Sequence, residues 1–278
     1  MSDDKLKAGQ LWREWFMTSA FSAEKRVHRM LRLLPHNPRC KFCNAPFEGI
    51  GSVLVRAVYG KKQSSLNPRF CSVCEDFAAK FPGGAEVEMS MLFADVRGST
   101  ALSEKMSAMD FSRLINRFYV ESTNAIIAED GLVEKLAGDA VAAFWGAGFA
   151  GPNYVARTIK VAQNISKMMA RQQIPVGIGV HAGVAYFGSM GTADGLIDIA
   201  AIGDEVNLAA RLASKAAAGE IILSEKALKE AGMDGSELES RSLELKGLRK
   251  IEVSVAYRSP QWGMQPAFGE TMHVLWDL

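Results

Sequence analysis

Four cysteines form two closely spaced pairs and are the only cysteines in the chain. The pairs are Cys40-x-x-Cys43 and Cys71-x-x-Cys74, with residues 44–70 between them. Two such pairs are typical of a site in which four thiolates hold one metal ion in a tetrahedron. We expect a structural Zn²⁺ here. An iron–sulfur cluster and an uncoordinated redox pair are the alternatives, whereas disulfides would fit a reducing compartment poorly.

Two aspartates stand where apolar, strand-like runs end. Asp95 closes the run MSMLFADV, and Asp139 lies in EKLAGDAVAAFWG, where a Gly-Asp pair between two apolar runs predicts a hairpin with a carboxylate at its tip. If the two strand ends lie side by side, their carboxylates can bridge two hard divalent cations. Such cations suit phosphoryl chemistry, because one lowers the pKa of an attacking hydroxyl and the other neutralises a triphosphate.

The stretch Arg97-Gly98-Ser99-Thr100 follows Asp95 and is predicted to open a helix. Free N–H groups at a helix start can hold phosphate oxygens. Gly-Asp turns and capping Asp and Ser residues are common in any α/β protein, so either segment alone is better explained as structural. Together, at this spacing, the two segments favour a nucleotide site.

The elements that must position these residues follow from apolar periodicity. We place amphipathic helices at 1–36, a four-cysteine domain at 37–80 whose segment GKKQSSLNPRF is a polar loop, a linker at 81–86, an α/β domain at 87–258 and an unassigned tail at 259–278. Helical patterns cover 5–34, 99–129 and 152–173, and strand-like runs lie at 131–136, 140–145, 175–182, 184–190, 219–223, 241–246 and 250–257. This alternation predicts a sheet covered by helices.

Composition narrows the class of protein. The chain has 278 residues, of which 48% are hydrophobic, and a net charge of +1. No apolar stretch approaches the ~20 residues of a membrane helix, and the N-terminus lacks the order of a signal peptide, so we expect a cytoplasmic protein without a membrane span. Residues 1–85 carry 14 Lys and Arg against 7 Asp and Glu. We interpret this basic part as solvated side chains rather than a nucleic-acid surface.

Five ordered blocks over residues 88–257 resemble the class III nucleotide cyclases, the family of adenylate and guanylate cyclase catalytic domains. The blocks are LFADVRGSTALSE, VEKLAGDAVAAFWG, VGIGVHAGVAYFGSMG, DIAAIGDEVNLAARL and ELKG. The resemblance implies an α/β (α+β) fold of the ferredoxin-like βαββαβ type, here with a small N-terminal helical and four-cysteine metal-binding domain. It also implies a phosphorus–oxygen lyase that closes a nucleoside triphosphate into its 3′,5′-cyclic monophosphate and releases pyrophosphate.

By similarity to the family, Asp95 and Asp139 would bind two Mg²⁺ or Mn²⁺ ions, with the main-chain carbonyl of Val96 as a further ligand. The main-chain amides of residues 97–100 would hold the triphosphate. Lys246 in ELKG is a candidate for contacting the terminal phosphates.

Two further residues carry the expected catalytic roles. Asn207 would orient the ribose, and Arg211 would stabilise the charge that builds on the α-phosphate during in-line attack by the 3′-hydroxyl. They are four apart in a predicted helix and hence on one face. In the family, each site combines metal ligands from one subunit with this Asn and Arg from the other. Because the chain carries both sets once, we expect a homodimer with two equivalent sites and an inactive monomer.

Lys135 indicates the base. Cyclases that use ATP typically carry Lys at this position and those that use GTP carry Glu, because an ammonium donates to adenine N1 whereas guanine presents an N–H there. The resemblance therefore implies ATP as substrate and cyclic AMP as product. The second base-reading position, usually Asp, Thr or Ser, is Ala200, whose methyl group accepts no hydrogen bond. Asp198 lies two residues upstream, which is the same side if this segment is a strand, and is a candidate to replace it.

Other functions stay open at this point. A close variant would use GTP or a pyrimidine triphosphate, which Ala200 allows. A catalytically silent, zinc-dependent binding or regulatory module would keep the fold without the chemistry, but the metal-binding Asp and the Arg that such proteins usually lose are present. We interpret His181 as a packed strand residue. His28, His36 and His273 belong to no recognisable site.

Overall fold

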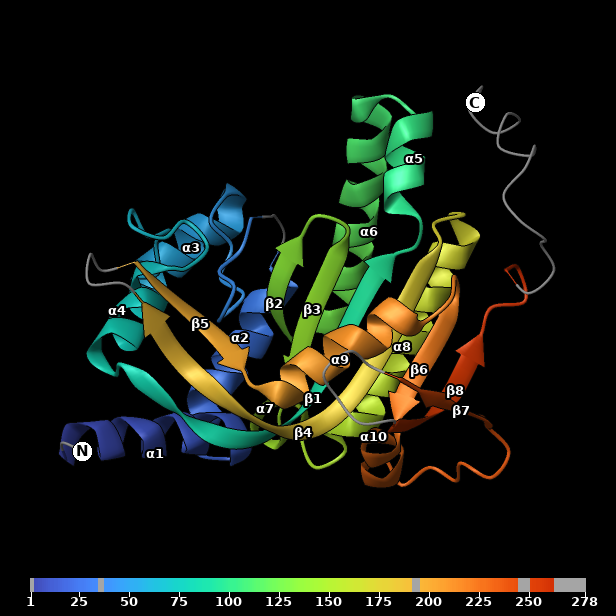
Figure 1. Ribbon diagram of the computed structural model, residues 1–278. Helices are drawn as coiled ribbons and strands as arrows, with labels where there is room; N and C mark the ends of the chain where they lie inside the picture. Colours follow the sequence, from blue (N-terminus) through green and yellow to red (C-terminus); the bar gives the residue numbers. More distant parts are fainter. Residues whose placement is uncertain (1–2, 35–37, 192–195, 245–250, 263–278) are drawn as a thin grey trace.

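The computed structural model describes residues 3–34, 38–191, 196–244 and 251–262. The helices are α1 (Asp3–Met17), α2 (Ser22–Leu33), α3 (Gly49–Tyr59), α4 (Ser72–Lys80), α5 (Ser99–Lys105), α6 (Ala108–Ala128), α7 (Ala147–Ala150), α8 (Tyr154–Arg171), α9 (Asp204–Lys215) and α10 (Glu225–Glu230). The strands are β1 (Gly83–Val96), β2 (Leu132–Ala137), β3 (Ala140–Trp145), β4 (Val176–Gly191), β5 (Ile197–Ile202), β6 (Glu220–Ser224), β7 (Glu239–Leu243) and β8 (Ile251–Arg258) (Figure 1). None of the described helices combines the length and the apolar content needed to cross a membrane.

One mixed sheet organises the described part of the chain. Its strand order is β2-β3-β1-β4-β6-β8-β7, and β5 pairs with the last part of β4. The four strands β4-β1-β3-β2 are antiparallel neighbours, with α6 between β1 and β2 in the chain and α8 between β3 and β4. This is the ferredoxin-like βαββαβ arrangement, so the predicted fold class is confirmed.

Strand β1 is paired with β4 along its whole length, from Gly83 to Val96. The linker predicted at 81–86 is therefore wrong from residue 83 onward, where the strand has already begun. A Cβ atom on Gly84 would lie 2.2 Å from the carbonyl oxygen of Phe187. The Pro-Gly-Gly sequence that resembles a turn is thus a place where two strands approach too closely for a side chain.

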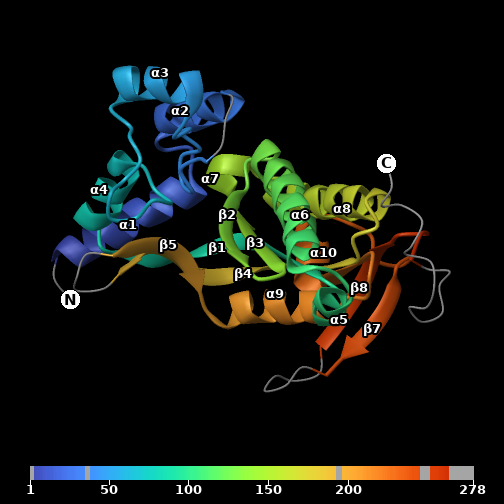
Figure 2. The same cartoon turned by 90° about the horizontal axis from the view of Figure 1, so that it is seen from above.

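Residues of β1 alternate between two cores, as the period of a strand requires. Leu92 lies in the core under α6 and α8, whereas its neighbour Met91 lies in a second core. Figure 2 shows α6 and α8 on one side of the sheet and α9 on the other. A Cβ atom on Gly179 of β4 would lie 2.3 Å from the backbone nitrogen of Ala213, so this glycine lets α9 rest directly on the sheet.

The N-terminal helices share the second core with the sheet. Trp12 and Phe16 of α1 are buried there, and the Trp12 ring packs edge-on against Phe187 of β4 with 5.8 Å between ring centroids. The Trp12 indole N–H also donates to the Phe81 carbonyl oxygen at 2.9 Å. The amphipathic stripe predicted over 5–34 is confirmed as two helices, and its apolar face packs on the α/β domain.

Other departures from the predicted elements have local causes. The helix expected over 99–129 is divided into α5 and α6, because the Ser107 hydroxyl accepts from the Asp110 amide and caps a new helix. The strand-like runs predicted at 175–182 and 184–190 form the single strand β4, which continues through Gly183. This glycine also gives room to Glu205 of α9, whose Cδ would lie 2.9 Å from a Cβ atom at this position. The pattern did not predict α3, α4, α7 or α10, and the strand β5 entered the prediction only as an assumption about the side on which Asp198 lies.

A buried carboxylate fastens the last three strands of the chain. Glu220 of β6 is fully buried and accepts from Arg241 of β7 at 2.8 Å and from Arg258 of β8 at 2.9 Å. Burial alone would raise the pKa of Glu220, but hydrogen bonds from Arg241, the Ala217 amide and Arg258 outweigh it and lower the pKa below its usual value. The fold therefore favours the ionised carboxylate.

We predict that Glu220→Gln lowers the free energy of unfolding by about 2–3 kcal/mol at neutral pH, because two guanidinium groups lose their shared buried charge. The pKa of Glu220 is lower in the folded than in the unfolded chain. Its stabilisation is thus fully present above the unfolded pKa of about 4.3 and is lost as the pH falls through the folded value. Denaturant unfolding should show the gap between wild type and variant shrinking below about pH 4.5.

The matched control is Glu239→Gln, which removes a half-exposed carboxylate from the same two arginines. This change should lower the free energy of unfolding by less than about 1 kcal/mol. Equal losses in the two variants would contradict the role given to burial.

Candidate active site

Asp95 and Asp139 meet at one corner of the sheet. Asp95 is the second-last residue of β1 and pairs in register with Ala140, the first residue of β3. Gly138 and Asp139 form the turn between β2 and β3, as predicted, and the Val96 amide donates to the Asp139 carbonyl oxygen at 2.9 Å. Gly138 has a φ of 62°, the left-handed region that favours glycine. Backbone pairing thus places the two aspartates beside each other.

The charge of Asp139 acts on the carboxyl group of Asp95. Burial raises the pKa of Asp95, the positive charge of Arg97 lowers it, and the negative charge of Asp139 raises it again, which leaves the pKa above its usual value. A bound cation relieves such repulsion between neighbouring carboxylates. Carboxylate and main-chain carbonyl oxygens are the donors that Mg²⁺ and Mn²⁺ accept, so the residues present fit a site for divalent cations.

Each carboxylate also has a partner from the segment that follows β1. The Arg97 guanidinium donates to the Asp95 carboxylate and, at 3.0 Å, to the carbonyl oxygen of Ser214 in α9. The Ser99 hydroxyl donates to the Asp139 carboxylate. A cation that binds Asp95 must therefore share this carboxylate with Arg97 or displace it.

Helix α5 begins directly beside Asp139. Gly98 precedes the helix with a φ of 66°, and the amides of Ser99 and Thr100 lie in the first turn, where no helix carbonyl can accept from them. The amide of Arg97 differs from the prediction, because it already donates to the Pro175 carbonyl oxygen at 2.7 Å. The phosphate-holding amides expected over 97–100 are therefore reduced to those of 98–100.

Asn207 and Arg211 project from α9, one helical turn apart. Asn207 is exposed and Arg211 partly exposed, and neither side chain has a hydrogen bond or ion pair with a residue that the structure describes. The ion-pair partner of Asp95 within the described chain is Arg97. Within one chain, Arg211 therefore makes no ion pair with the aspartate pair.

A buried histidine fixes the start of α9. Nε2 of His181 in β4 is hydrogen-bonded to the Glu205 carboxylate, and its Nδ1 lies 2.7 Å from Ser224 Oγ at the end of β6. Burial lowers the pKa of His181 and the hydrogen bond with Glu205 opposes this, which leaves the pKa below its usual value. The prediction of a packed strand residue is confirmed. The link to Glu205 was not predicted, because the two residues are far apart in the sequence.

The two expected base-reading positions lie on β2 and β5. Lys135 of β2 is exposed and, among the described residues, has no hydrogen-bond or ion-pair partner. Ala200 of β5 is partly exposed and pairs with Gly188 of β4. Lys246, the predicted contact of the terminal phosphates, lies outside the described residues.

Asp198, the candidate to replace Ala200 as an acceptor, is bound by the four-cysteine domain. Its carboxylate lies 2.7 Å from Lys41 Nζ and 3.7 Å from an Arg69 nitrogen. Burial raises the pKa of Glu134, next to Lys135, and the charges of Lys41 and Asp198 also act on this carboxyl group. These groups of β2, β5 and the four-cysteine domain are therefore close neighbours, which the sequence pattern did not predict.

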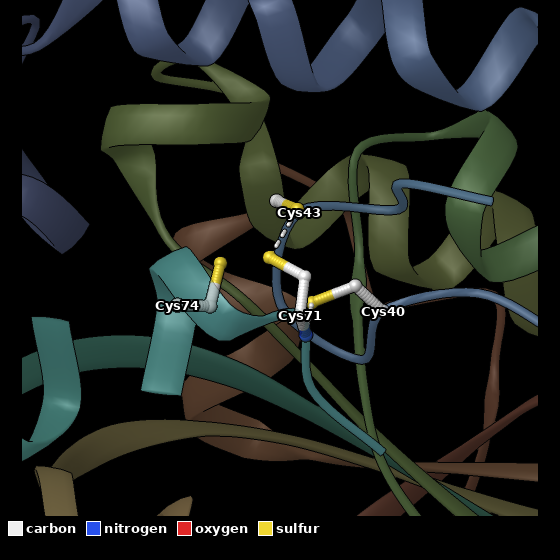
Figure 3. A group of neighbouring side chains, drawn as sticks. All are labelled: Cys40, Cys43, Cys71 and Cys74. Atoms are coloured by element: carbon white, nitrogen blue, oxygen red, sulfur yellow. Dashed lines mark hydrogen bonds between the residues drawn. The ribbon is translucent and has the colours of Figure 1, made fainter. Parts of the chain in front are cut away.

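The four cysteine sulfurs form a compact cluster, with Cys40 and Cys43 before α3 and Cys71 and Cys74 at the start of α4 (Figure 3). All four residues are buried, their sulfurs lie within 4.8 Å of one another, and no disulfide joins them. The sulfurs of Cys43 and Cys71 are 3.7 Å apart. Sulfurs bound at about 2.3 Å to one tetrahedral Zn²⁺ would be about 3.8 Å apart. The cluster thus fits the predicted metal site.

Comparison with known proteins gives consistent sequence matches. A family model described as the adenylate and guanylate cyclase catalytic domain matches residues 84–256. An uncharacterised protein of Mycobacterium tuberculosis is 34% identical over 136 residues, which are 47% of this chain and 24% of that protein. An adenylate cyclase of Anabaena cylindrica is 32% identical over 134 residues, which are 45% of this chain and 26% of that protein. The chain spans about a quarter of the length of these curated relatives.

Solved structures share the fold. The guanylyl cyclase Cya2 aligns with a TM-score of 0.58 at 22% identity, over 65% of this chain and 98% of that one. The adenylyl cyclase CyaB from P. aeruginosa aligns with a TM-score of 0.55 at 27% identity, over 64% of this chain and 98% of that one. Because the family model covers more than half of the chain, including both aspartates of the sheet corner, the chain belongs to the family of adenylate and guanylate cyclase catalytic domains.

Proposed function

We propose that this chain converts ATP into 3′,5′-cyclic AMP and pyrophosphate at a site shared by two copies of the chain. The observation that carries the proposal is the strand register that holds Asp95 beside the Asp139 turn, next to the start of α5. The family match and the adenylate cyclase among the similar proteins support this class of reaction. The cytoplasmic location expected from the sequence stays a prediction.

The proposed reaction is an in-line displacement. The ribose 3′-hydroxyl gives its proton to solvent and its oxygen forms a bond to the α-phosphorus, while the bond from that phosphorus to the bridging oxygen breaks and pyrophosphate leaves. Divalent cations, when bound at the aspartate pair, lower the pKa of the 3′-hydroxyl and neutralise the triphosphate. Asp95 and Asp139 hold these cations in place. Asn207 orients the ribose, and the fixed charge of Arg211 stabilises the negative charge that builds on the α-phosphate.

The position of α9 supports a shared site. Among the described residues, the Arg211 side chain forms no ion pair or hydrogen bond, and in particular none with Asp95 or Asp139 of its own chain. Each chain nevertheless carries the aspartate pair and the Asn207–Arg211 pair once. In a two-fold homodimer, each aspartate pair can face the α9 helix of the other chain, which completes two equivalent sites.

Lys135 supports ATP as the substrate, because its exposed ammonium can donate to adenine N1. A specific observation keeps GTP or a pyrimidine triphosphate as the second candidate. Ala200 supplies no acceptor for the adenine amino group, and the Asp198 carboxylate is already bound to Lys41. One discriminating contact is therefore missing from the base site.

Zn²⁺ is our proposal for the ion at the four cysteines, with an iron–sulfur cluster as the alternative. Four buried thiols at distances suited to tetrahedral coordination support zinc. The ion would tie the two cysteine loops together and thereby stabilise this small segment. A catalytically silent module is less well supported, because the aspartate pair, Asn207 and Arg211 are all present.

We predict that the purified chain, given ATP with Mg²⁺ or Mn²⁺, releases pyrophosphate and 3′,5′-cyclic AMP, identified by mass spectrometry in a panel of four nucleoside triphosphates. Asp139→Asn should lower kcat/KM by about 100-fold or more, because a neutral amide holds a divalent cation poorly. The control is Glu104→Gln on α5, whose exposed carboxylate has no partner in the described chain. No turnover of any triphosphate by the wild-type dimer would refute the proposal.

Mixing two inactive variants tests the shared site. Asp139→Asn and Arg211→Ala should each be inactive alone, because every site then lacks one group. After subunit exchange, half of the dimers carry one intact site, so activity should recover to about a quarter of the wild-type rate. Persistent inactivity of the exchanged mixture, with mixed dimers verified by native mass spectrometry, would place both groups in one chain.

Lys135→Glu tests the choice of base. A carboxylate repels adenine N1 but accepts from the guanine N–H, so the ratio of kcat/KM for ATP to that for GTP should fall by at least about tenfold. Lys229→Glu on α10 makes the same charge change at an exposed position outside the site and should leave the ratio unaltered. An unaltered ratio in both variants would mean that Lys135 does not read the base.

A further inference from the structure

Lys41 connects the four-cysteine cluster with β5. It lies between Cys40 and Cys43, and its ammonium donates to Asp198 Oδ1 at 2.7 Å and to the Ile199 carbonyl oxygen at 2.9 Å. Only 5% of the Lys41 side chain is exposed. A lysine is buried to this extent only where its charge and its donors are satisfied, so these two bonds specify how the loop sits on the strand.

Arg69 extends the contact to β2. It lies two residues before Cys71, and one of its nitrogens donates to the Glu134 carbonyl oxygen at 3.1 Å while another lies 3.7 Å from Asp198 Oδ2. The neighbouring Asn67 side chain donates to the Ile197 carbonyl oxygen at 2.8 Å. The second cysteine loop thus bridges the two strands that carry the expected base-reading positions.

The cysteine cluster determines where these side chains can lie. The Lys41 amide donates to the Arg69 carbonyl oxygen at 2.8 Å, which joins the two loops. The Cys71 amide donates to Cys40 Sγ at 3.2 Å, a contact typical of loops that wrap a common centre. Because all four sulfurs lie within 4.8 Å of one another, the loops cannot move apart without opening the cluster.

We propose that the four-cysteine domain is a positioning element for the base site, in which Lys41 and Arg69 hold β5 and β2 at the spacing that lets Lys135 and Ala200 meet the base. Asp198 then serves as the anchor of this contact and does not read the base. The inference rests on the proposed cyclase function. Base contacts act equally in the ground and transition states, so loosening them raises KM and leaves kcat largely unchanged.

The test is Lys41→Met in the full chain, which keeps the length of the apolar stem and removes the ammonium. We expect KM for ATP to rise about tenfold, equivalent to about 1.4 kcal/mol, with kcat within about twofold of wild type. Amide hydrogen exchange without nucleotide should accelerate over 132–137 and 197–202 and not in α6 or α8. Lys62→Met is the matched control, because this lysine, between α3 and α4 of the same four-cysteine domain, is exposed and its side chain has no partner among the described residues.

A double-mutant cycle separates the ion pair from general loosening. Lys41→Met leaves Asp198 with a partly unpaired carboxylate, so the double variant Lys41→Met/Asp198→Asn should be less impaired than the sum of the single variants. Removing the cysteine-bound metal from the wild type with a chelator should accelerate exchange in the same two segments. This readout does not depend on turnover.

Three outcomes would overturn the inference. The first is an unchanged KM for ATP in Lys41→Met, and the second is amide hydrogen exchange that accelerates throughout the chain. The third is amide hydrogen exchange in β2 and β5 that neither the substitution nor the chelator accelerates. If the wild type turns over no triphosphate, the proposed cyclase function fails. The exchange measurements still decide whether the cysteine loops hold the two strands.

Discussion

Backbone pairing on both sides of β1 is the constraint on which the rest of this structure depends. Two carboxylates repel each other, so a fold that keeps Asp95 beside Asp139 must hold them by something stiffer than side chains. Here β3 and β4 flank β1, and the amide after Asp95 binds the carbonyl oxygen of Asp139. The hydrogen bonds of the sheet centre therefore fix the position of both acids before any cation binds.

The other groups of the proposed site are positioned against the same sheet. Helix α9 rests on β4 where Gly179 has no side chain, and His181 holds its first turn through Glu205. Lys41 of the first cysteine loop binds the Asp198 carboxylate on β5, and Arg69 of the second loop binds the Glu134 carbonyl oxygen on β2. The sheet thus supports three separate sets of residues, and the N-terminal helices and cysteine loops pack onto it through the second core.

The sequence predicts what depends on neighbouring residues and misses what depends on distant ones. The Gly138–Asp139 hairpin, the cysteine spacing and a sheet covered by helices follow from local period and turn chemistry. The βαββαβ order follows from the resemblance to the cyclase family, and the structure has all of these features. The contact of Lys41 with Asp198 joins residues that no local pattern connects. The linker predicted at the Gly83–Gly84 pair was wrong for a different reason. A glycine pair indicates either a turn or a close approach of two strands, and only tertiary packing decides between them.

In the proposed enzyme, the aspartate pair of one chain and the α9 arginine of another meet at one nucleotide. A crystal structure with Mn²⁺ and a non-cyclisable ATP analogue tests this arrangement directly, because anomalous scattering locates the metal. We expect manganese between the carboxylates of Asp95 and Asp139, with Arg211 of the neighbouring chain at the α-phosphate. Manganese away from these carboxylates, or an analogue contacted by a single chain, would contradict it.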